Sequence, residues 1–569
     1  MKLNNQPTDE VQNQIELEIT GMTCQSCAAH VVQTLKEVEG MAAAHIPDWH
    51  SGRAAITVHT AVSDKLLVEA VEQAGYEAAV VPPRTVTVSQ PPTRNGDNAD
   101  YDLIVIGTGG GGVAAVIKAA ELGYRAAIIE GGTIGGTCVN IGCVPSKTLI
   151  RAAKAYHQAT HHGFRGIQTR AEGVDWSALM QHKDELVAEM RQSKYVDVLT
   201  SYGENITLIR GWARLKTGQE VILDDGRVLR ANKIVVATGA RPNILPLSGI
   251  EAVEVLTSTT AMALKKQPES LLVIGGRAVA LELGQTFARL GTQVTILQRS
   301  PRLIPDYEPE IAAEVADALR AEEVAIHTGL TPQGIREENG HKVVIVKVNG
   351  EQREFRAEQV LMATGRTPNT QALGLAEVGV ELDEHGFIKV NDRMETTNAH
   401  IYAVGDVTNR PEFVYVAAAA GGIAAANALT NEGKSLNLNI LPEVIFTDPQ
   451  IAKVGLTEAE AAARGYDIRV STLPLEYVPR ALAARDTRGL IKLVSDRNSD
   501  RLLGAHVLAA EGGEIIQTAA LAVKFGLQYG FTVENLREML FPYLTQVEGL
   551  KLAAQTFEKD VAQLSCCAG

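Results

Sequence analysis

Apolar residues recur along the chain in short stretches that end in glycines or in helical patterns. Residues 15–19 alternate as Ile-Glu-Leu-Glu-Ile, which is typical of a half-buried strand. A helical pattern then reaches Leu35, and a further apolar strand is expected near residues 54–58. This pattern predicts a small α/β unit over residues 1–81, with Met22 in its core rather than acting as a ligand.

A glycine-rich turn follows the next strong strand signal, YDLIVIG, which starts at Tyr101. Gly107, Gly109 and Gly112 take the G-x-G-x-x-G positions before a helix, and a second strand ends at Glu130. Such glycines let the backbone approach a pyrophosphate, and an acid about 20 residues on binds a ribose hydroxyl. Strand, helix and acid together predict a dinucleotide-binding fold.

A second, degenerate turn occurs in SLLVIGGRAVALELGQ, where Gly275 and Gly276 are followed by Arg277 in place of the second glycine. The next strand ends without an acid and is followed by Arg299 and Arg302. Guanidinium groups bind a 2'-phosphate, so this fold is expected to prefer NADPH to NADH. The alternative is that both arginines are solvated surface residues.

Three more segments, 235–242, 361–369 and 396–407, each read as a strand that enters a glycine turn. Asp406 ends the last strand, where it either binds a flavin's ribityl and phosphate oxygens or caps a turn. From about Pro442 the pattern changes to an amphipathic helix, strands and long helices, which indicates a separate α+β module.

Length and charge limit the class of protein. The 569 residues predict several domains, and a 45% hydrophobic content is sufficient for well-formed cores. A net charge of -14 argues against nucleic acid or an anionic membrane as a partner. No signal peptide or membrane-spanning run is recognised. We expect a cytoplasmic protein without membrane insertion.

Six cysteines form three pairs of different spacing, namely Cys24/Cys27, Cys138/Cys143 and Cys566/Cys567. In reduced cytosol such pairs are metal-binding or catalytic rather than structural. The middle pair, in GGTCVNIGCVPSK, is spaced so that one helical turn would carry both sulfurs, although free cysteines also serve as small buried apolar residues.

The two outer pairs suit soft metal ions. Adjacent Cα atoms lie about 3.8 Å apart, whereas an unstrained disulfide needs about 4.4 Å or more. The tail pair is therefore better suited to binding a thiophilic metal. The front pair lies in GMTCQSC on a strand-to-helix loop, and by itself fits either metal binding or a thioredoxin-type redox motif.

From Tyr101 onward the chain resembles the pyridine-nucleotide disulfide oxidoreductases, the family that includes glutathione reductase and dihydrolipoamide dehydrogenase. The first 81 residues resemble the heavy-metal-associated domain, a ferredoxin-like βαββαβ fold. The resemblance implies an α/β architecture with two Rossmann-like domains for FAD and NADPH and an α+β dimerisation domain. The implied order is a metal-binding domain at 1–81, a Pro- and Thr-rich flexible linker at 82–99, an FAD domain at 100–241 and 367–441, an NADPH domain at 242–366, and a dimerisation domain at 442–569.

The family plan also implies residue roles. Cys143 would lie against the flavin as the charge-transfer thiol, and Cys138 would be the outer, exchanging thiol. Lys147 would approach the flavin and pair with Glu282. Further FAD contacts are implied at Gly132, Thr137, Ala213 and Val414.

The clearest departure from the disulfide-reducing members lies in FPYLTQVEGLK, where Tyr543 takes the place of their histidine and Glu548 is retained. A histidine can protonate a leaving thiolate near neutral pH, whereas a tyrosine with a pKa near 10 does not suit that role. Tyr543 and Tyr195 match tyrosines that line the metal site in the branch of the family that reduces Hg(II). Without the family, both read as buried aromatics.

That branch implies a substrate and a route. Hg(II), carried as a thiol complex, would be captured by Cys24/Cys27 or by Cys566/Cys567 and passed by thiolate exchange to the middle pair for reduction. A homodimer is implied, because the tail of one subunit serves its partner, and mercury-transport proteins are candidate donors. The alternatives are an FAD disulfide reductase acting on glutathione or lipoamide, and a metal carrier without catalysis.

Overall fold

A computed structural model describes residues 13–22, 25–38, 40–46, 53–58, 62–80 and 99–564. The chain divides into two compact units, Met1–Pro91 and Pro92–Gly569. The division falls within the predicted linker 82–99, of which residues 82–98 lie outside the described ranges. Each unit is therefore described separately.

The N-terminal unit has the expected βαββαβ order. Its elements are β1 (Asn13–Thr20), α1 (Gln25–Lys36), β2 (Met41–His45), β3 (Arg53–Val58), α2 (Asp64–Gln73) and β4 (Glu77–Val80). The strands form an antiparallel sheet in the order β2-β3-β1-β4, in which Leu17 lies opposite both Ala54 and Val80. Alternate apolar residues of β1 are buried against both helices, and Met22 packs against this core as expected. The ferredoxin-like fold is confirmed.

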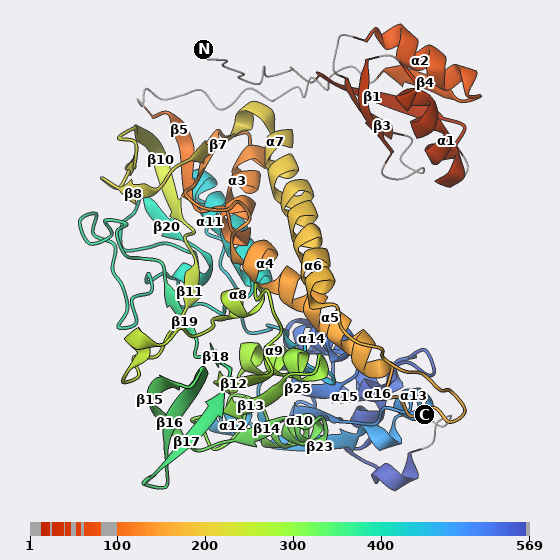
Figure 1. The fold of residues 1–569 in the computed structure, drawn as a ribbon, viewed down its shortest axis with the longest axis vertical. Helices are drawn as coiled ribbons and strands as arrows, with labels where there is room; N and C mark the ends of the chain where they lie inside the picture. Colours follow the sequence, from red (N-terminus) through yellow and green to blue (C-terminus); the bar gives the residue numbers. More distant parts are fainter. Residues whose placement is uncertain are drawn as a thin grey trace. The chain divides into compact units, whose positions relative to one another are not determined.

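The first nucleotide fold of the larger unit contains a parallel sheet in the order β7-β6-β5-β10-β20. These strands are β5 (Tyr101–Ile106), β6 (Ala126–Glu130), β7 (Ile206–Arg210), β10 (Val228–Val236) and β20 (Ile401–Ala403), with β8 (Ala213–Leu215) and β9 (Glu220–Leu223) added antiparallel beyond β10. Leu103 and Val105 pack against α3 (Gly110–Glu121) and α11 (Val414–Thr430), which lie side by side (Figure 1). Ile104 and Ile106 face a second core on the other side.

The second nucleotide fold is a four-stranded parallel sheet in the order β14-β13-β12-β18. It contains β12 (Ser270–Ile274), α9 (Ala278–Arg289), β13 (Gln293–Leu297), α10 (Pro309–Ala321), β14 (Ala325–His327) and β18 (Gln359–Met362). An antiparallel meander of β15 (Thr331–Glu338), β16 (His341–Val348) and β17 (Glu351–Ala357) is inserted before β18. Two short antiparallel strands, β11 (Ala240–Pro242) and β19 (Arg366–Pro368), join this fold to the first.

The C-terminal module, drawn in blue in Figure 1, is a five-stranded antiparallel sheet in the order β21-β22-β25-β24-β23. Its strands are β21 (Glu443–Ile445), β22 (Gln450–Gly455), β23 (Ile468–Pro474), β24 (Leu490–Asp496) and β25 (Leu502–Ala509). Its helices are α12 (Glu458–Ala463), α13 (Pro479–Ala484), α14 (Gly512–Tyr529), α15 (Val533–Glu538) and α16 (Glu548–Gln555). Large apolar side chains remain exposed on α14 and after α15, namely Leu521, Phe525, Leu527, Tyr529, Met539, Leu540, Tyr543 and Leu544. A cluster of this kind is typical of a surface that binds protein.

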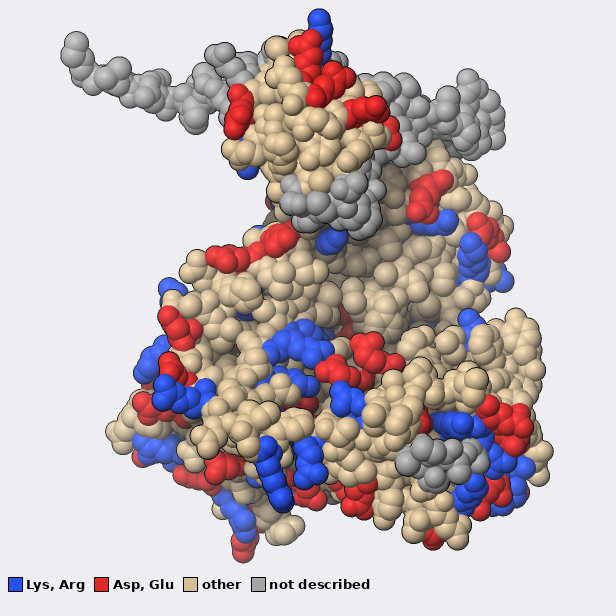
Figure 2. All heavy atoms as spheres, turned by 90° about the vertical axis from the view of Figure 1, so that its right-hand side faces the viewer, with Lys and Arg blue, Asp and Glu red and all other residues tan. Residues whose placement is uncertain are grey.

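Charged side chains of both signs lie close together over the lower part of the face shown in Figure 2. None of the helices in the described parts of the chain has the length and apolar content needed to cross a bilayer.

Candidate active site

A cavity of about 2040 Å³ extends between the two nucleotide folds. Pockets for small ligands usually have volumes of about 300–1,000 Å³, so this one has room for ligands of dinucleotide size. Its lining includes the first glycine turn, both central cysteines and the start of α9. The sequence-predicted residues that line it are Gly107, Gly109, Glu130, Thr137, Cys138, Cys143, Lys147, Ala213, Glu282, Asp406 and Val414.

The first glycine turn has the form of a phosphate cradle. Gly107 has a φ of +106°, and a Cβ there would lie 2.4 Å from the carbonyl oxygen of Ala237. A Cβ on Gly112 would lie 2.0 Å from the oxygen of Gly107, so both positions require glycine. A Cβ built on Gly109 would meet nothing closer than 4.0 Å, and Gly109 lines the cavity at the start of α3. Backbone N–H groups at such a helix start bind a pyrophosphate.

Glu130 ends β6 beside this turn. Its Oε2 accepts hydrogen bonds from the backbone and hydroxyl of Thr108, at 3.1 and 2.5 Å, and its Oε1 accepts from the N–H of Gly132 at 2.8 Å. A carboxylate offers about four acceptor positions, so lone pairs remain for a ribose hydroxyl. The residues of the first fold therefore fit a dinucleotide.

The second turn has the same strand-to-helix geometry. Gly275 has a φ of +128°, and a Cβ there would lie 2.2 Å from the oxygen of Ala363. A Cβ on Gly276 would lie 2.9 Å from the side chain of Gln298. Arg277 caps α9, lines the cavity and forms an ion pair with Asp306. In the sequence this arginine is recognisable only as a replacement of the second glycine of the fingerprint.

The two arginines expected to bind a 2'-phosphate lie outside the lining of the cavity. Arg299 is exposed. Arg302 is half-buried, and its Nη2 donates to the carbonyl oxygens of Pro305 and Tyr307, at 2.7 and 3.1 Å. The guanidinium of Arg302 is thus engaged with its own loop.

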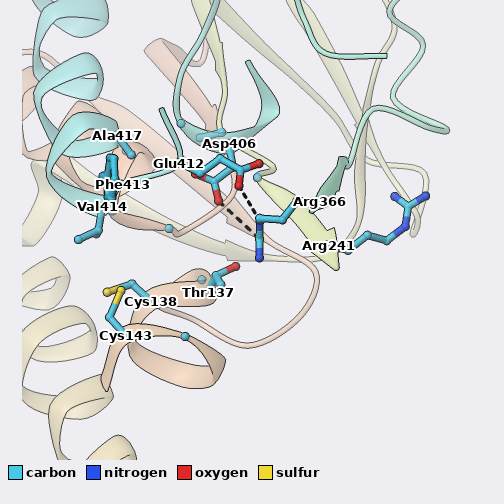
Figure 3. Close-up of a pocket in the computed structure, with 18 of the residues that line it drawn as sticks. Thr137, Cys138, Cys143, Arg241, Arg366, Asp406, Glu412, Phe413, Val414 and Ala417 are labelled. Carbon is cyan, nitrogen blue, oxygen red and sulfur yellow. Dashed lines mark ion pairs between the residues drawn. The ribbon is translucent and has the colours of Figure 1, made fainter. Parts of the chain in front are cut away.

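The central cysteines lie on two helices rather than on one turn. Cys138 belongs to α4 (Gly136–Ile141) and Cys143 begins α5 (Cys143–Gln158). Gly142 separates them, with φ -129° and ψ -111°, and a Cβ on it would lie 2.9 Å from the oxygen of Thr137. This break turns the two sulfurs toward each other (Figure 3).

The two thiols are electrostatically unequal. A hydrogen bond from the Cys138 thiol lowers the pKa of Cys143 to about 7, and the positive charge of Lys147 acts in the same direction. The same hydrogen bond raises the pKa of Cys138, and burial adds to this effect. In the reduced pair Cys143 is therefore the thiolate and Cys138 the proton donor. Only a thiolate is an effective nucleophile and metal ligand.

Lys147 and Glu282 form the predicted pair. Lys147 lies one turn after Cys143 on α5, and its Nζ is 2.8 Å from Oε2 of the buried Glu282 on α9. The other carboxylate oxygen, Oε1, accepts from the N–H of Phe446 at 2.9 Å, and Nζ also lies 4.5 Å from the centre of the Phe446 ring. One carboxylate thus joins α5, α9 and the start of the C-terminal module.

A buried polar network continues this contact along α9. Gln285 accepts from the N–H of Asp448 at 2.8 Å and donates to its carbonyl oxygen at 2.9 Å. Arg289 lies between two carboxylates, with its nitrogens 2.9 Å from Asp448 and 2.6 Å from Glu322. Lys154 of α5 is 3.2 Å from Asp448. This network could not be predicted from the sequence, because its members come from distant segments.

The two predicted tyrosines lie in different surroundings. Tyr195 is half-buried in η2 (Gln192–Val196), a π-helical turn of the kind that often occurs at functional sites. Burial raises its pKa, and the charges of Cys138 and Cys143 add to this, so it is a neutral phenol near neutral pH. Tyr543 is 53% exposed, and neither tyrosine is among the residues that line the cavity. The neighbouring Glu548 is buried and accepts from the N–H of Leu544 at 3.2 Å.

Asp406 lies in a 3-10 turn after β20, where burial raises its pKa. Arg366 of β19 lies between two carboxylates, 3.5 Å from Asp406 and 3.8 Å from Glu412 (Figure 3). Burial raises the pKa of Glu412 to about 7. Glu412 was not identified from the sequence, since nothing in its local pattern distinguishes it from a surface acid.

The outer cysteine pairs are described only in part. Cys27 is half-buried in α1, while Cys24, Cys566 and Cys567 lie outside the described residues. Within the described ranges, no group of three or more His, Cys, Asp and Glu side chains has metal-binding geometry.

Comparison with known proteins agrees with this site. Residues 101–421 match the family "Pyridine nucleotide-disulphide oxidoreductase", residues 441–554 match its dimerisation domain, and residues 16–77 match "Heavy-metal-associated domain". The chain therefore belongs to the pyridine nucleotide-disulphide oxidoreductases, enzymes that use a flavin and a pyridine nucleotide. The fold class expected from the sequence is confirmed.

Within this family the chain groups with the mercuric reductases, as the sequence resemblance indicated. It is 43% identical to "Mercuric reductase" of Lysinibacillus sphaericus over 558 residues, covering 98% of this chain and all of the relative. It is 44% identical to that of Shigella flexneri over 574 residues, covering 97% of this chain and all of the relative. A solved structure, the Cu(II) complex of the HOCl-induced flavoprotein disulfide reductase RclA from Escherichia coli, matches with a TM-score of 0.72 at 30% identity, covering 81% of this chain and 99% of that one.

Proposed function

We propose that this protein is an NADPH-dependent FAD enzyme that reduces Hg(II) to Hg(0). The observation that carries the proposal is the polarised thiol pair, a Cys143 thiolate beside a Cys138 thiol, in a cavity shared by two nucleotide folds. Two sulfurs in contact can hold a soft cation, which thiolates prefer to hard ions. The choice of mercury rests on the relatives that bear the name mercuric reductase.

FAD would lie along the first fold. The Gly107–Gly112 turn would hold the pyrophosphate, Glu130 the ribose and Asp406 the ribityl chain, while Gly132, Thr137, Ala213 and Val414 would be further contacts. When bound, the flavin transfers two electrons from NADPH to the site of the sulfur pair.

The chain's own residues account for the metal exchange. Hg(II) arrives bound by two carrier thiolates, and the Cys143 thiolate displaces one of them. Cys138 gives its proton to the second departing carrier thiolate and becomes the other ligand. The hydrogen bond from Cys138 and, to a smaller extent, the positive charge of Lys147 favour the ionised form of Cys143 before the exchange begins. Two electrons supplied by NADPH would then convert Hg(II) to Hg(0). The proton released as NADPH becomes NADP+ would restore the Cys138 thiol, so that the pair is ready for the next ion.

Delivery of the ion is assigned to the outer cysteine pairs. Cys24/Cys27 would receive Hg(II) from carrier thiols or transport proteins, and Cys566/Cys567 would pass it to the cavity of a partner subunit. The exposed apolar side chains on α14 and after α15, with Tyr543 among them, support a homodimer in which this surface faces the partner. Tyr543 and Tyr195 would then line the metal site from two subunits.

It remains a prediction that the second nucleotide fold prefers NADPH to NADH. The guanidinium of Arg302 is bound to carbonyl oxygens and that of Arg277 is paired with Asp306, so the exposed Arg299 is the better candidate for a phosphate contact. A ratio of kcat/KM values for NADPH and NADH in Arg299→Ala, Arg302→Ala and Arg277→Ala proteins would assign the contact. The arginine that binds the 2'-phosphate is the one whose removal lowers the ratio.

A disulfide reductase is the second candidate, favoured by the similarity to the disulfide reductase RclA. The replacement of the family's histidine by Tyr543 argues against it.

Purified protein should consume NADPH with Hg(II) and excess thiol while releasing mercury vapour. Turnover of oxidised glutathione at a comparable rate would favour the second candidate. The Cys138→Ala variant should release no vapour, and Cys566→Ala/Cys567→Ala should lower the rate when Hg(II) is held by tight carriers.

A further inference from the structure

Trp212 is an aromatic side chain with no role in the mechanism described so far. It is 69% exposed, whereas Trp176, the other tryptophan in the described part of the chain, is 8% exposed. Its backbone is fixed between the ends of β7 and β8: its N–H donates to Oδ1 of Asp224 at 3.2 Å, and its carbonyl accepts from the N–H of Asp224 at 2.9 Å. An exposed indole is thus held on an ordered backbone, at one end of the cavity.

The orientation of the indole follows from its contact with Gly131. A Cβ built on Gly131 would lie 2.4 Å from Cδ2 of Trp212 and 2.7 Å from both Cε2 and Cε3. Cδ2 is a fusion atom with three bonded ring neighbours, so an atom nearest to it lies above the ring plane rather than at its edge. One face of the indole therefore covers Gly131. The other face accounts for the large exposure of the side chain.

We infer that the open face of the Trp212 indole is a stacking platform for the adenine ring of the bound dinucleotide. This inference rests on the FAD that the proposed function places in the first fold. Glu130 is the expected contact of the adenosine ribose, and Gly131, the next residue, lies under the indole. Adenine is bonded to that ribose, so it must lie within reach of Trp212 and Ala213, which both line this end of the cavity.

The platform explains why a tryptophan is exposed here and why residue 131 is glycine. Single exposed apolar residues are common on proteins and need no ligand. Trp212 differs because it lines the cavity next to the ribose position and because any side chain at residue 131 would overlap the indole. Aromatic stacking contributes about 1–3 kcal/mol per base. Because each 1.4 kcal/mol corresponds to a tenfold change in Kd, removal of the indole should weaken binding of the dinucleotide about 5- to 150-fold.

The test measures flavin affinity, not turnover. Apoprotein is titrated with FAD, and separately with FMN, which has the flavin but no adenine. The variants are Trp212→Ala, Trp212→Phe, which keeps an aromatic face, and Phe164→Ala, a control for an exposed aromatic (45%) outside the cavity lining. Melting temperatures confirm that each variant folds.

We expect the Kd for FAD to rise about 5- to 150-fold in Trp212→Ala and to stay close to the wild-type value in Trp212→Phe and Phe164→Ala. The Kd for FMN should be unchanged in Trp212→Ala. A wild-type Kd for FAD in Trp212→Ala would overturn the inference, as would an equal loss of FMN affinity. Wild-type protein that binds no FAD would instead contradict the proposed function, so the two failures are distinguishable.

Discussion

The ionisation of Cys143 gives the sharpest prediction from this site. The pKa of its thiol falls from an ordinary value of 9.0 to about 7, and the largest cause is the hydrogen bond from Cys138. A hydrogen bond to a charged group contributes about 1.5–3 kcal/mol, which equals about one to two pH units. Cys138→Ala should therefore raise the pKa of Cys143 to between about 8 and 9. Lys147→Met should raise it less, because the lysine charge is a smaller cause.

The assay is a pH titration of the charge-transfer absorbance between the Cys143 thiolate and the bound, oxidised flavin. This signal excludes the outer cysteine pairs, because a thiolate must contact the flavin to produce it. Lys147→Arg retains the positive charge and is the control for Lys147→Met. The reasoning is refuted if Cys138→Ala leaves the titration midpoint unchanged, or if Lys147→Met shifts it further than Cys138→Ala does.

Three further results are expected from the buried and tightly packed residues. Arg289→Met removes the most deeply buried cation beside Asp448 and Glu322, next to which Lys154 and Arg488 remain. Because these cations remain, it should lower the free energy of unfolding by about 1–3 kcal/mol, whereas the exposed Arg320→Met should change it by less than about 1 kcal/mol in the same denaturant titration. Gly112→Ala should abolish flavin content, while Gly422→Ala, where a Cβ meets nothing within 4 Å, should retain it; equal flavin content would contradict the cradle. Because burial raises the pKa of Glu412 to about 7, the native state binds its proton more tightly than the unfolded state does, and stability is lost as pH rises from about 4.5 to 7. Glu412→Gln apoprotein should therefore melt higher than wild type at pH 8 and not at pH 4, and an equal gain at both pH values would rule this out.

Local sequence patterns were sufficient to predict those helices, strands and turns that depend only on residues close together in the chain. Alternation over residues 15–19 predicted β1, and the run from Tyr101 to Glu130 predicted β5, the glycine turn and β6, since each depends on neighbouring residues only. The core position of Met22 followed in the same way. The residue roles at the flavin and metal sites came from the family resemblance and stay predictions.

Features that depend on three-dimensional contacts, whether between near or distant residues, were not predictable. The chain breaks into two helices at Gly142, where a Cβ would lie 2.9 Å from the oxygen of Thr137, although the spacing of Cys138 and Cys143 suggested a single helical turn. Arg302 reads as a phosphate ligand in sequence, but its own loop occupies the guanidinium. A role for Trp212 could not be predicted from the sequence, because the position of its indole depends on contact with Gly131, which lies 81 positions earlier in the chain.

The carboxylate of Glu282 constrains how this enzyme can be recombined with its relatives. It accepts from Lys147 beside the sulfurs and from the backbone of Phe446 at the entrance to the C-terminal module. A chimera with its crossover after Pro449 keeps all three partners from one parent. A crossover before β21 would place Phe446 and its neighbours from the second parent opposite α9 of the first. The carboxylate that positions the ammonium group of Lys147 next to Cys143 would then accept its other hydrogen bond from a backbone of different parentage.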